Sequence, residues 1–199
     1  MKNKNVLELY WRDTMKKIAI GKQSFEDIRK KDCFYIDKTD FIKDWWESAD
    51  DVTLITRPRR FGKTLNMDML KCFFSNQYEG RKELFKGLDI WKDEEYRKLQ
   101  GTYPVIFLSF AGIKQTEYSK AVTMIKNEIT DIYNKYDYIM KSDLYNNNEK
   151  IQFKSVWPDM SDEIAQKAIN DLSNYLSRYY GKKVIIILDE YVNPCVFLF

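Results

Sequence analysis

A short motif that could bind phosphate lies between an apolar run and a helical pattern. It consists of Gly62, Lys63 and Thr64. They match the end of the phosphate-binding pattern Gly, four residues, Gly-Lys-Ser/Thr, although Arg57 stands in place of the first glycine. In that pattern the second glycine lets the backbone approach a phosphate, the lysine reaches the β- and γ-phosphates, and the hydroxyl binds Mg²⁺. The first glycine mainly eases a bend, so its replacement removes no ligand. The predicted nucleotide-binding residues are Arg59, Arg60, Phe61, Gly62, Lys63, Thr64 and Leu65.

A second half-motif follows downstream, where the apolar run 184–188 ends in Asp189 and Glu190. Such a run is typical of a strand buried on both faces of a parallel sheet. At its end, one carboxylate can hold Mg²⁺ and an adjacent glutamate can polarise the attacking water. We therefore predict Thr64 and Asp189 as metal ligands and Glu190 as the catalytic residue. Each half-motif alone is common, as a helix start or as a strand reaching solvent, but both in this order favour binding of Mg-ATP.

Strands and helices alternate along the chain and must position these residues. The apolar pattern predicts core strands at 52–56, 103–110 and 184–188, and a shorter strand at 33–36. It predicts helices at 24–31, 41–46, 65–74, 118–139 and 161–180, the first and last capped by Ser24 and Ser161. Residues 75–98 are expected to form a charged surface excursion and residues 141–160 a loop. This alternation predicts an α/β fold with three layers.

Composition limits the classes of protein further. The chain of 199 residues is long enough for one core, and its net charge of +3 is too small to require a nucleic-acid or membrane partner. Its three cysteines have no paired spacing and there is no histidine, which favours reduced thiols and a cytoplasmic location. No apolar run approaches the length of a membrane span.

Three strings together resemble the AAA-ATPase-like family of bacterial P-loop proteins: 35–39 (Tyr-Ile-Asp-Lys-Thr), 54–64 and 187–191. The specific part is Arg-Pro-Arg-Arg-Phe-Gly-Lys-Thr, in which Arg57 is the residue expected for the family. The resemblance implies a P-loop NTPase core with a mainly parallel sheet over residues 15–199, after an N-terminal extension at 1–14 that would be absent if translation began at Met15. It also implies ATP and Mg²⁺ as ligands. Residues 35–39 either contact the adenine or cap a helix, and both readings stay open.

The end of the chain departs from the resemblance. Family members continue after Tyr191 with an acidic residue and a proline, whereas Val192, Asn193 and Pro194 follow here. Members are also generally longer, with one more strand between those of the two half-motifs and often a C-terminal region similar to PD-(D/E)XK nucleases. We therefore expect a truncated N-terminal part with an incomplete sheet. Its unpaired edge, and the apolar residues 195–199, could associate with another copy.

The leading functional prediction is an ATP-binding protein with Mg-dependent ATP hydrolysis. The alternatives are a nucleotide-gated regulatory or interaction module with negligible turnover, and an inactive truncated fragment. A small-molecule kinase is a weaker alternative, because adjacent carboxylates favour hydrolysis. No membrane or nucleic-acid partner is indicated.

Overall fold

The protein is described by a computed structural model that covers residues 16–56, 61–113 and 117–190. The chain divides into two compact units. Unit 1 consists of Met1–Phe73 and Gly80–Gln100, and unit 2 of Phe74–Glu79 and Gly101–Phe199. Composition alone suggested one core, but the buried side chains belong to two units, which are described separately below.

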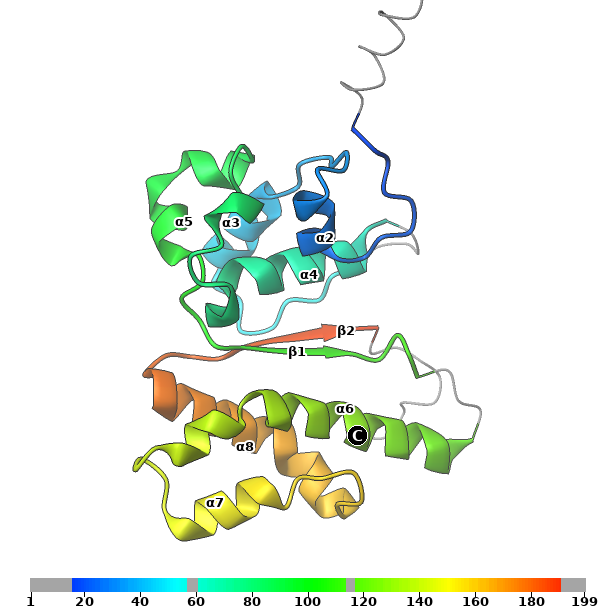
Figure 1. Ribbon diagram of the computed structural model, residues 1–199, viewed down its shortest axis with the longest axis vertical. Helices are drawn as coiled ribbons and strands as arrows, with labels where there is room; N and C mark the ends of the chain where they lie inside the picture. The colour runs from blue at the N-terminus through cyan, green and yellow to red at the C-terminus, as the bar shows by residue number, and fades with distance from the viewer. Residues whose placement is uncertain (1–15, 57–60, 114–116, 191–199) are drawn as a thin grey trace, which may run out of the picture. The chain divides into compact units, whose positions relative to one another are not determined.

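Unit 1 is built from short helices (Figure 1). Their bounds are α2 (Phe25–Lys30), α3 (Asp40–Ser48), α4 (Lys63–Phe74, whose last residue falls in unit 2), η2 (Lys82–Leu84), η3 (Asp89–Lys92) and α5 (Glu94–Leu99). The predicted N-cap of α2 is confirmed, since the Ser24 hydroxyl accepts the N–H of Asp27 at 3.2 Å. The predicted helix after the Gly-Lys-Thr motif is also confirmed, as α4.

Residues 75–98 were expected to be a surface excursion, and this prediction is wrong. They contain a set of buried apolar side chains: Leu84, Phe85, Leu88, Ile90 and Tyr96. The ring of Phe85 contacts those of Phe25, Phe73 and Trp91, with centroids 5.2, 5.1 and 6.2 Å apart. The 3₁₀ turns here are too short to show helical periodicity, so the many charges obscured a segment that completes the core of unit 1.

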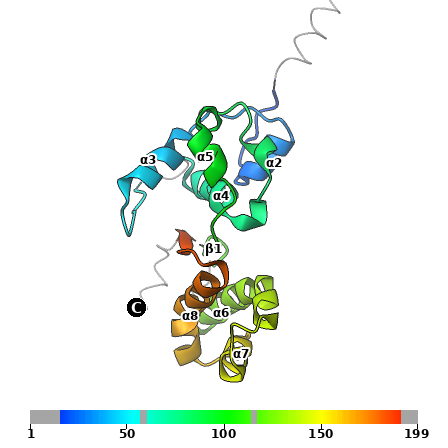
Figure 2. The same ribbon diagram turned by 90° about the vertical axis from the view of Figure 1, so that its left-hand side faces the viewer.

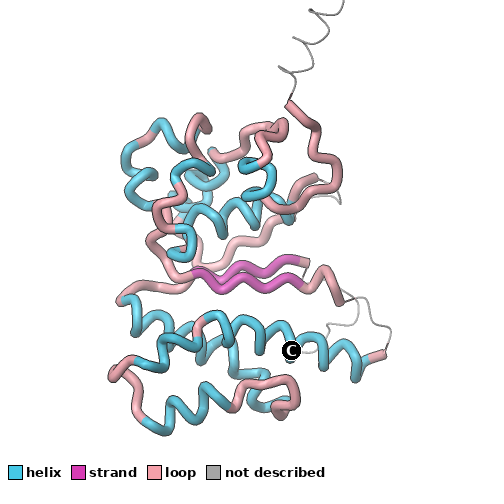
Figure 3. Tube along the Cα trace, in the orientation of Figure 1, coloured by secondary structure: helices cyan, strands magenta, loops and turns pink. Residues whose placement is uncertain are grey.

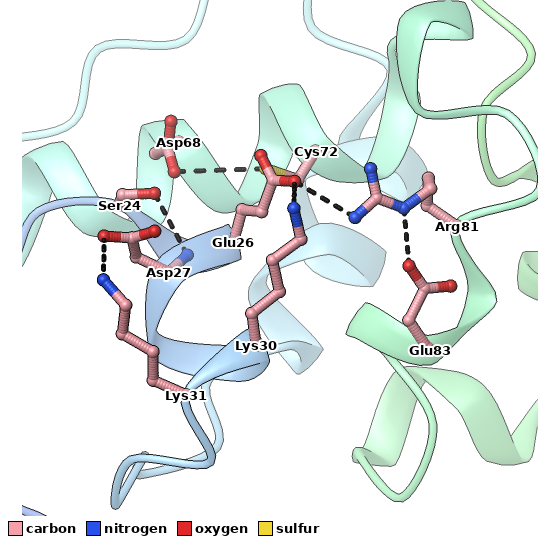
Figure 4. A network of polar contacts seen from close by, with 9 residues as sticks. All are labelled: Ser24, Glu26, Asp27, Lys30, Lys31, Asp68, Cys72, Arg81 and Glu83. Atoms are coloured by element: carbon pink, nitrogen blue, oxygen red, sulfur yellow. Dashed lines mark hydrogen bonds and ion pairs between the residues drawn. The ribbon is translucent and has the colours of Figure 1, made fainter.

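Polar contacts connect α2 to its neighbours in unit 1 (Figure 4). Asp68 on α4 accepts the backbone N–H of Phe25 at 2.7 Å, which fixes the start of α2 against α4. Arg81 binds Glu26 at 3.0 Å and Glu83 at 2.5 Å. The guanidinium lowers the pKa of Glu83 below its ordinary value, mainly by hydrogen bonding to the carboxylate. These contacts hold α2 in place beside the helix that follows the Gly-Lys-Thr motif.

The predicted strand at 52–56 does not form. The described residues there lack strand structure, and the side chains of Val52 and Leu54 are largely exposed. An apolar run becomes a strand only when a neighbour hydrogen-bonds to it, and within the described residues β1 and β2 pair only with each other. The predicted strand at 33–36 is likewise reduced to one parallel bridge between Ile18 and Phe34.

Unit 2 holds both strands of the described structure (Figure 3). Its elements are η1 (Asn76–Tyr78), β1 (Val105–Ser109), α6 (Tyr118–Lys135), η4 (Asp137–Lys141), α7 (Asn147–Lys154), α8 (Asp162–Tyr180) and β2 (Ile185–Asp189). The strands pair in parallel, with Val105 opposite Ile185 and Ser109 opposite Asp189. Two of the three predicted core strands are therefore confirmed, and their carboxyl ends meet at one end of the sheet.

Helices α6 and α8 lie along one face of this sheet, and α7 lies beyond them (Figures 1 and 2). Ile106 and Leu108 of β1 share a buried cluster with Leu172 of α8 and Ile132 of α6. The Tyr136 hydroxyl donates to the carbonyl of Val105 at 2.7 Å and so joins the end of α6 to β1. The helices thereby position the strand ends that carry polar residues.

The ends of the unit 2 helices follow local rules. The Ser161 hydroxyl accepts the N–H of Ile164 and caps α8, which ends at Gly181 in the left-handed region (φ 63°), as predicted.

The prediction of a loop at 141–160 is wrong, because α7 lies inside it. Asn146 and Glu149 form a capping box there, and such a cap can start a short helix in a polar sequence whose apolar period is weak.

The described part of the chain is therefore a mixed helix and strand structure with a small parallel sheet, compatible with an α/β fold. Ile186 and Leu188 of β2 remain 44% and 42% exposed. Self-association through such an apolar strand stays a prediction, and residues 195–199 lie outside the described residues. No helix within the described ranges is long and apolar enough to cross a membrane.

Candidate functional site

Gly62 makes the turn into α4. Its φ of +75° lies in the left-handed region, which strongly favours glycine. Its carbonyl accepts the N–H of Asn66 at 2.9 Å, so the helix begins directly after it. Lys63, Thr64 and Leu65, all half-buried, then form the first turn of α4. The N–H groups of a helix start and its positive dipole end attract anions, so the motif has the local geometry that phosphate binding needs.

The first turn of α4, like that of α6, carries no acidic residue, unlike those of the other described α-helices. The α4 turn begins with Lys63, whereas α2, α5 and α8 each carry two acidic residues in their first turns. A cation near a helix N-terminus is unfavourable by up to about 1 kcal/mol, and an anion removes that penalty. The charge pattern at this helix start is therefore one that a bound phosphate would stabilise.

The same turn contains a buried donor without an acceptor. Asn66 is 2% exposed, and its Nδ2 has no hydrogen-bond partner among the described residues. Leaving a buried amide donor unpaired costs about 1–3 kcal/mol. The first turn of α4 thus holds one buried donor that no described residue satisfies.

The segment 35–39 lies in the same unit and is held by its own side chains. Asp37 Oδ1 accepts the N–H and the hydroxyl of Thr39 at 2.9 and 2.7 Å, and its Oδ2 accepts the N–H of Asp89 at 2.7 Å. Thr39 is fully buried, and its hydroxyl oxygen accepts the N–H of Ile90 at 3.1 Å. Asp37 and Thr39 thus anchor the start of α3 to η3, but Thr39 occupies the N-cap position of α3 without a side-chain cap hydrogen bond, so the predicted capping by Thr39 is wrong.

Tyr35 is a half-buried member of this segment. Its hydroxyl donates to Met69 Sδ of α4 at 3.2 Å, and its ring packs edge-on against Phe25. Burial, followed by the nearby charge of Asp37, raises the pKa of Tyr35 to about 12, so the hydroxyl stays protonated as a donor. Tyr35 therefore fastens residues 35–39 to α4, the helix that follows the Gly-Lys-Thr motif.

In unit 2 the polar residues gather at the carboxyl end of the parallel strands. Asp189 is 1% exposed and pairs in register with Ser109, whose hydroxyl donates to Asp189 Oδ2 at 3.5 Å. Ligands of open α/β sheets bind at this end of the strands. Sequence reasoning missed Ser109, although a polar residue at the end of the predicted strand 103–110 was a signal for it.

Glu190 follows directly and has an uncommon backbone. Its φ of +52° lies in the left-handed region, which costs a non-glycine residue roughly 1–3 kcal/mol, and its side chain is exposed. Residues held in this way cluster at functional sites. Glu190 thus follows the buried Asp189 directly in the chain, at the point where β2 ends.

The predicted site residues thus fall into two half-sites. Gly62, Lys63, Thr64 and Leu65 form one at the start of α4, with an exposed Phe61 before them, and Asp189 and Glu190 form the other in unit 2. Arg59 and Arg60 lie outside the described residues. No group of three or more Cys, Asp or Glu side chains that could hold a metal occurs in the described ranges. The donors and cations of the first half-site fit phosphate. The carboxylates of the second are hard oxygen ligands that fit Mg²⁺. This ion takes many of its ligands from phosphates and water.

The candidate site thus consists of a helix that starts after a left-handed glycine with a lysine, and a buried carboxylate at the end of a parallel strand. Residues 19–199 match the family described as "Predicted AAA-ATPase", and the chain belongs to this family. It is also 38% identical over 98 residues to an uncharacterized protein in the vnfD 5′ region of Azotobacter chroococcum mcd 1. That match covers 49% of this chain and 17% of the length of the Azotobacter protein. No solved structure matches the chain.

Proposed function

We propose that the chain binds ATP with Mg²⁺ through the Gly62-Lys63-Thr64 turn and belongs to a P-loop core that hydrolyses it. The observation that carries the proposal is the start of α4, where a left-handed glycine is followed at once by a lysine and no acidic residue. Membership of the family supports ATP as the nucleotide. A three-layer P-loop core with a mainly parallel sheet is part of the same proposal.

Each residue has a proposed role. The N–H groups after Gly62 bind the phosphates, Lys63 neutralises their charge, and Arg59, Arg60, Phe61 and Leu65 complete the nucleotide-binding loop. Thr64 and Asp189 are the proposed Mg²⁺ ligands, and Ser109 positions Asp189. The bound metal would neutralise charge on the transferred phosphate. Glu190 orients the attacking water and accepts its proton, which is the role that makes the site an ATPase.

Replacing Glu190 with glutamine tests the catalytic part of the proposal. The amide keeps the size of the side chain but cannot accept a proton, so we expect turnover to fall by roughly 100-fold or more while ATP still binds. Phosphate release and equilibrium binding of ATP should be measured on the same preparations. Glu128→Gln, which changes an exposed glutamate on α6, is the matched control and should leave both values unchanged.

The outcome separates two functions that share one nucleotide site. Turnover lost in Glu190→Gln with ATP binding intact identifies an ATPase. ATP binding with weak turnover that is equal in wild type and Glu190→Gln would contradict the catalytic role and identify a nucleotide-gated module instead. Failure of the wild-type chain to bind ATP would refute both.

A further inference from the structure

We propose that Lys38 is a second phosphate-binding lysine, which contacts the nucleotide phosphates at the Gly62 turn from the segment 35–39. This inference rests on the proposed function and adds to it a residue from outside the Gly-Lys-Thr motif. Lys38 lies 24 positions before Gly62 in the chain (62 minus 38), so its place at the turn follows from the tertiary structure of unit 1.

The position of the Lys38 ammonium is the first argument. A methyl group placed on the Cα of Gly62 would lie 3.9 Å from Lys38 Nζ, and among the described residues other than its two chain neighbours no further atom would come within 4 Å of it. The space above the left-handed glycine is therefore bordered by a cation. In a phosphate-binding loop this is the space that the glycine leaves open for the approach of the ligand.

The backbone that carries Lys38 is fixed on both sides. The side chains of its neighbours Asp37 and Thr39 hydrogen-bond to each other and to the N–H groups of Asp89 and Ile90. The carbonyl of Lys38 accepts the N–H of Phe41 at 3.1 Å at the start of α3. Lys38 is thus a projecting side chain on a rigid turn, and a preorganised cation loses less entropy on binding a ligand.

Lys38 forms no ion pair within the described structure. Its side chain is exposed, and its Nζ has no ion-pair partner among residues 16–56, 61–113 and 117–190. The nearest acid in sequence, Asp37, already accepts hydrogen bonds on both carboxylate oxygens. Lys38 and Lys63 therefore place two positive charges around Gly62, and their mutual repulsion falls when an anion binds there.

The same geometry decides between phosphate and base as the partner of this segment. An ammonium group binds phosphate oxygens strongly as a point charge, whereas it offers an adenine ring no comparable partner. Tyr35 and Thr39, the neighbours that could contact a base, are engaged with Met69 and with Ile90. Ile36 and Lys38 are the exposed members of 35–39, and Lys38 is the one that carries a charge, so its chemistry selects the phosphates.

The test compares Mg-ATP with inorganic tripolyphosphate, which carries the phosphates without a base or sugar. The dissociation constant for Mg-ATP is measured directly and that for tripolyphosphate by competition, for wild type, Lys38→Ala, Lys38→Arg, Lys63→Ala and Lys98→Ala. We expect Lys38→Ala to weaken both ligands by about ten-fold and by the same factor, because one charge-assisted contact is lost. Lys38→Arg should retain most of the affinity, because it keeps the charge.

Lys98→Ala is the matched control, since it removes an exposed lysine of unit 1 that pairs with Glu94 on α5, and it should change neither affinity. Equal affinities of wild type and Lys38→Ala, with Lys63→Ala impaired, would overturn the role of Lys38 and leave the P-loop assignment standing. Loss of ATP affinity with unchanged tripolyphosphate affinity would overturn it in favour of a base contact. If wild type binds neither ligand, the proposed function and this inference fall together.

Discussion

Replacing Phe85 with alanine is expected to lower the free energy of unfolding of the protein by about 3–5 kcal/mol. Phe85 is fully buried, and its ring is surrounded by those of Phe25, Phe73 and Trp91. The substitution removes the apolar contact area and leaves a cavity between α2, η2 and α4, which cannot close without moving helix ends fixed by hydrogen bonds. Denaturant unfolding followed by circular dichroism measures the change.

Phe34→Ala is the matched control for this prediction, because the same ring is removed from a side chain that is 56% exposed. Phe34→Ala should lower the free energy of unfolding far less than Phe85→Ala, since little buried apolar area is lost and no cavity forms. Equal losses in the two variants would show that Phe85 is not part of a packed core, and residues 75–98 would then be the surface excursion that their charges suggested.

The second large loss of stability is expected when Leu172 of α8 is replaced. This side chain is fully buried in the cluster that joins α6 and α8 to β1. Leu172→Ala should lower the free energy of unfolding by about 2–5 kcal/mol, because apolar burial is lost and a cavity is left under the sheet. Ile151→Ala on α7 removes an aliphatic side chain that is 66% exposed and should have a small effect by comparison. A Leu172→Ala protein as stable as Ile151→Ala would contradict the packing of α8 against the sheet.

Features that depend on neighbouring residues in the chain could be predicted from the sequence. The helix α4 follows from apolar residues at helical spacing after Gly62, and the caps at Ser24, Ser161 and Gly181 are local hydrogen bonds or backbone preferences. The strand β2 and its terminal Asp189 follow from a continuous apolar run that ends in carboxylates. These elements carry most of the candidate site.

Features that depend on distant partners could not be predicted. Residues 52–56 have strand composition, but a strand also needs a hydrogen-bonded neighbour, and composition does not supply one. The pairing of Ser109 with Asp189 depends on the register of two strands 80 residues apart, and the approach of Lys38 to Gly62 depends on how 35–39 is anchored to η3. Each became visible only when the tertiary structure was known.

The central claim is that the Gly62-Lys63-Thr64 turn binds Mg-ATP, and thermal unfolding with and without the ligand tests it directly. A ligand that binds only the folded state stabilises it by roughly 2.7 kcal/mol at a hundredfold excess over its dissociation constant. For a chain of this length that raises the midpoint by roughly 5–10 °C. We expect this rise in the wild-type protein and none in Lys63→Ala. No shift at millimolar Mg-ATP, or an equal shift in Lys63→Ala, would contradict the assignment of the site.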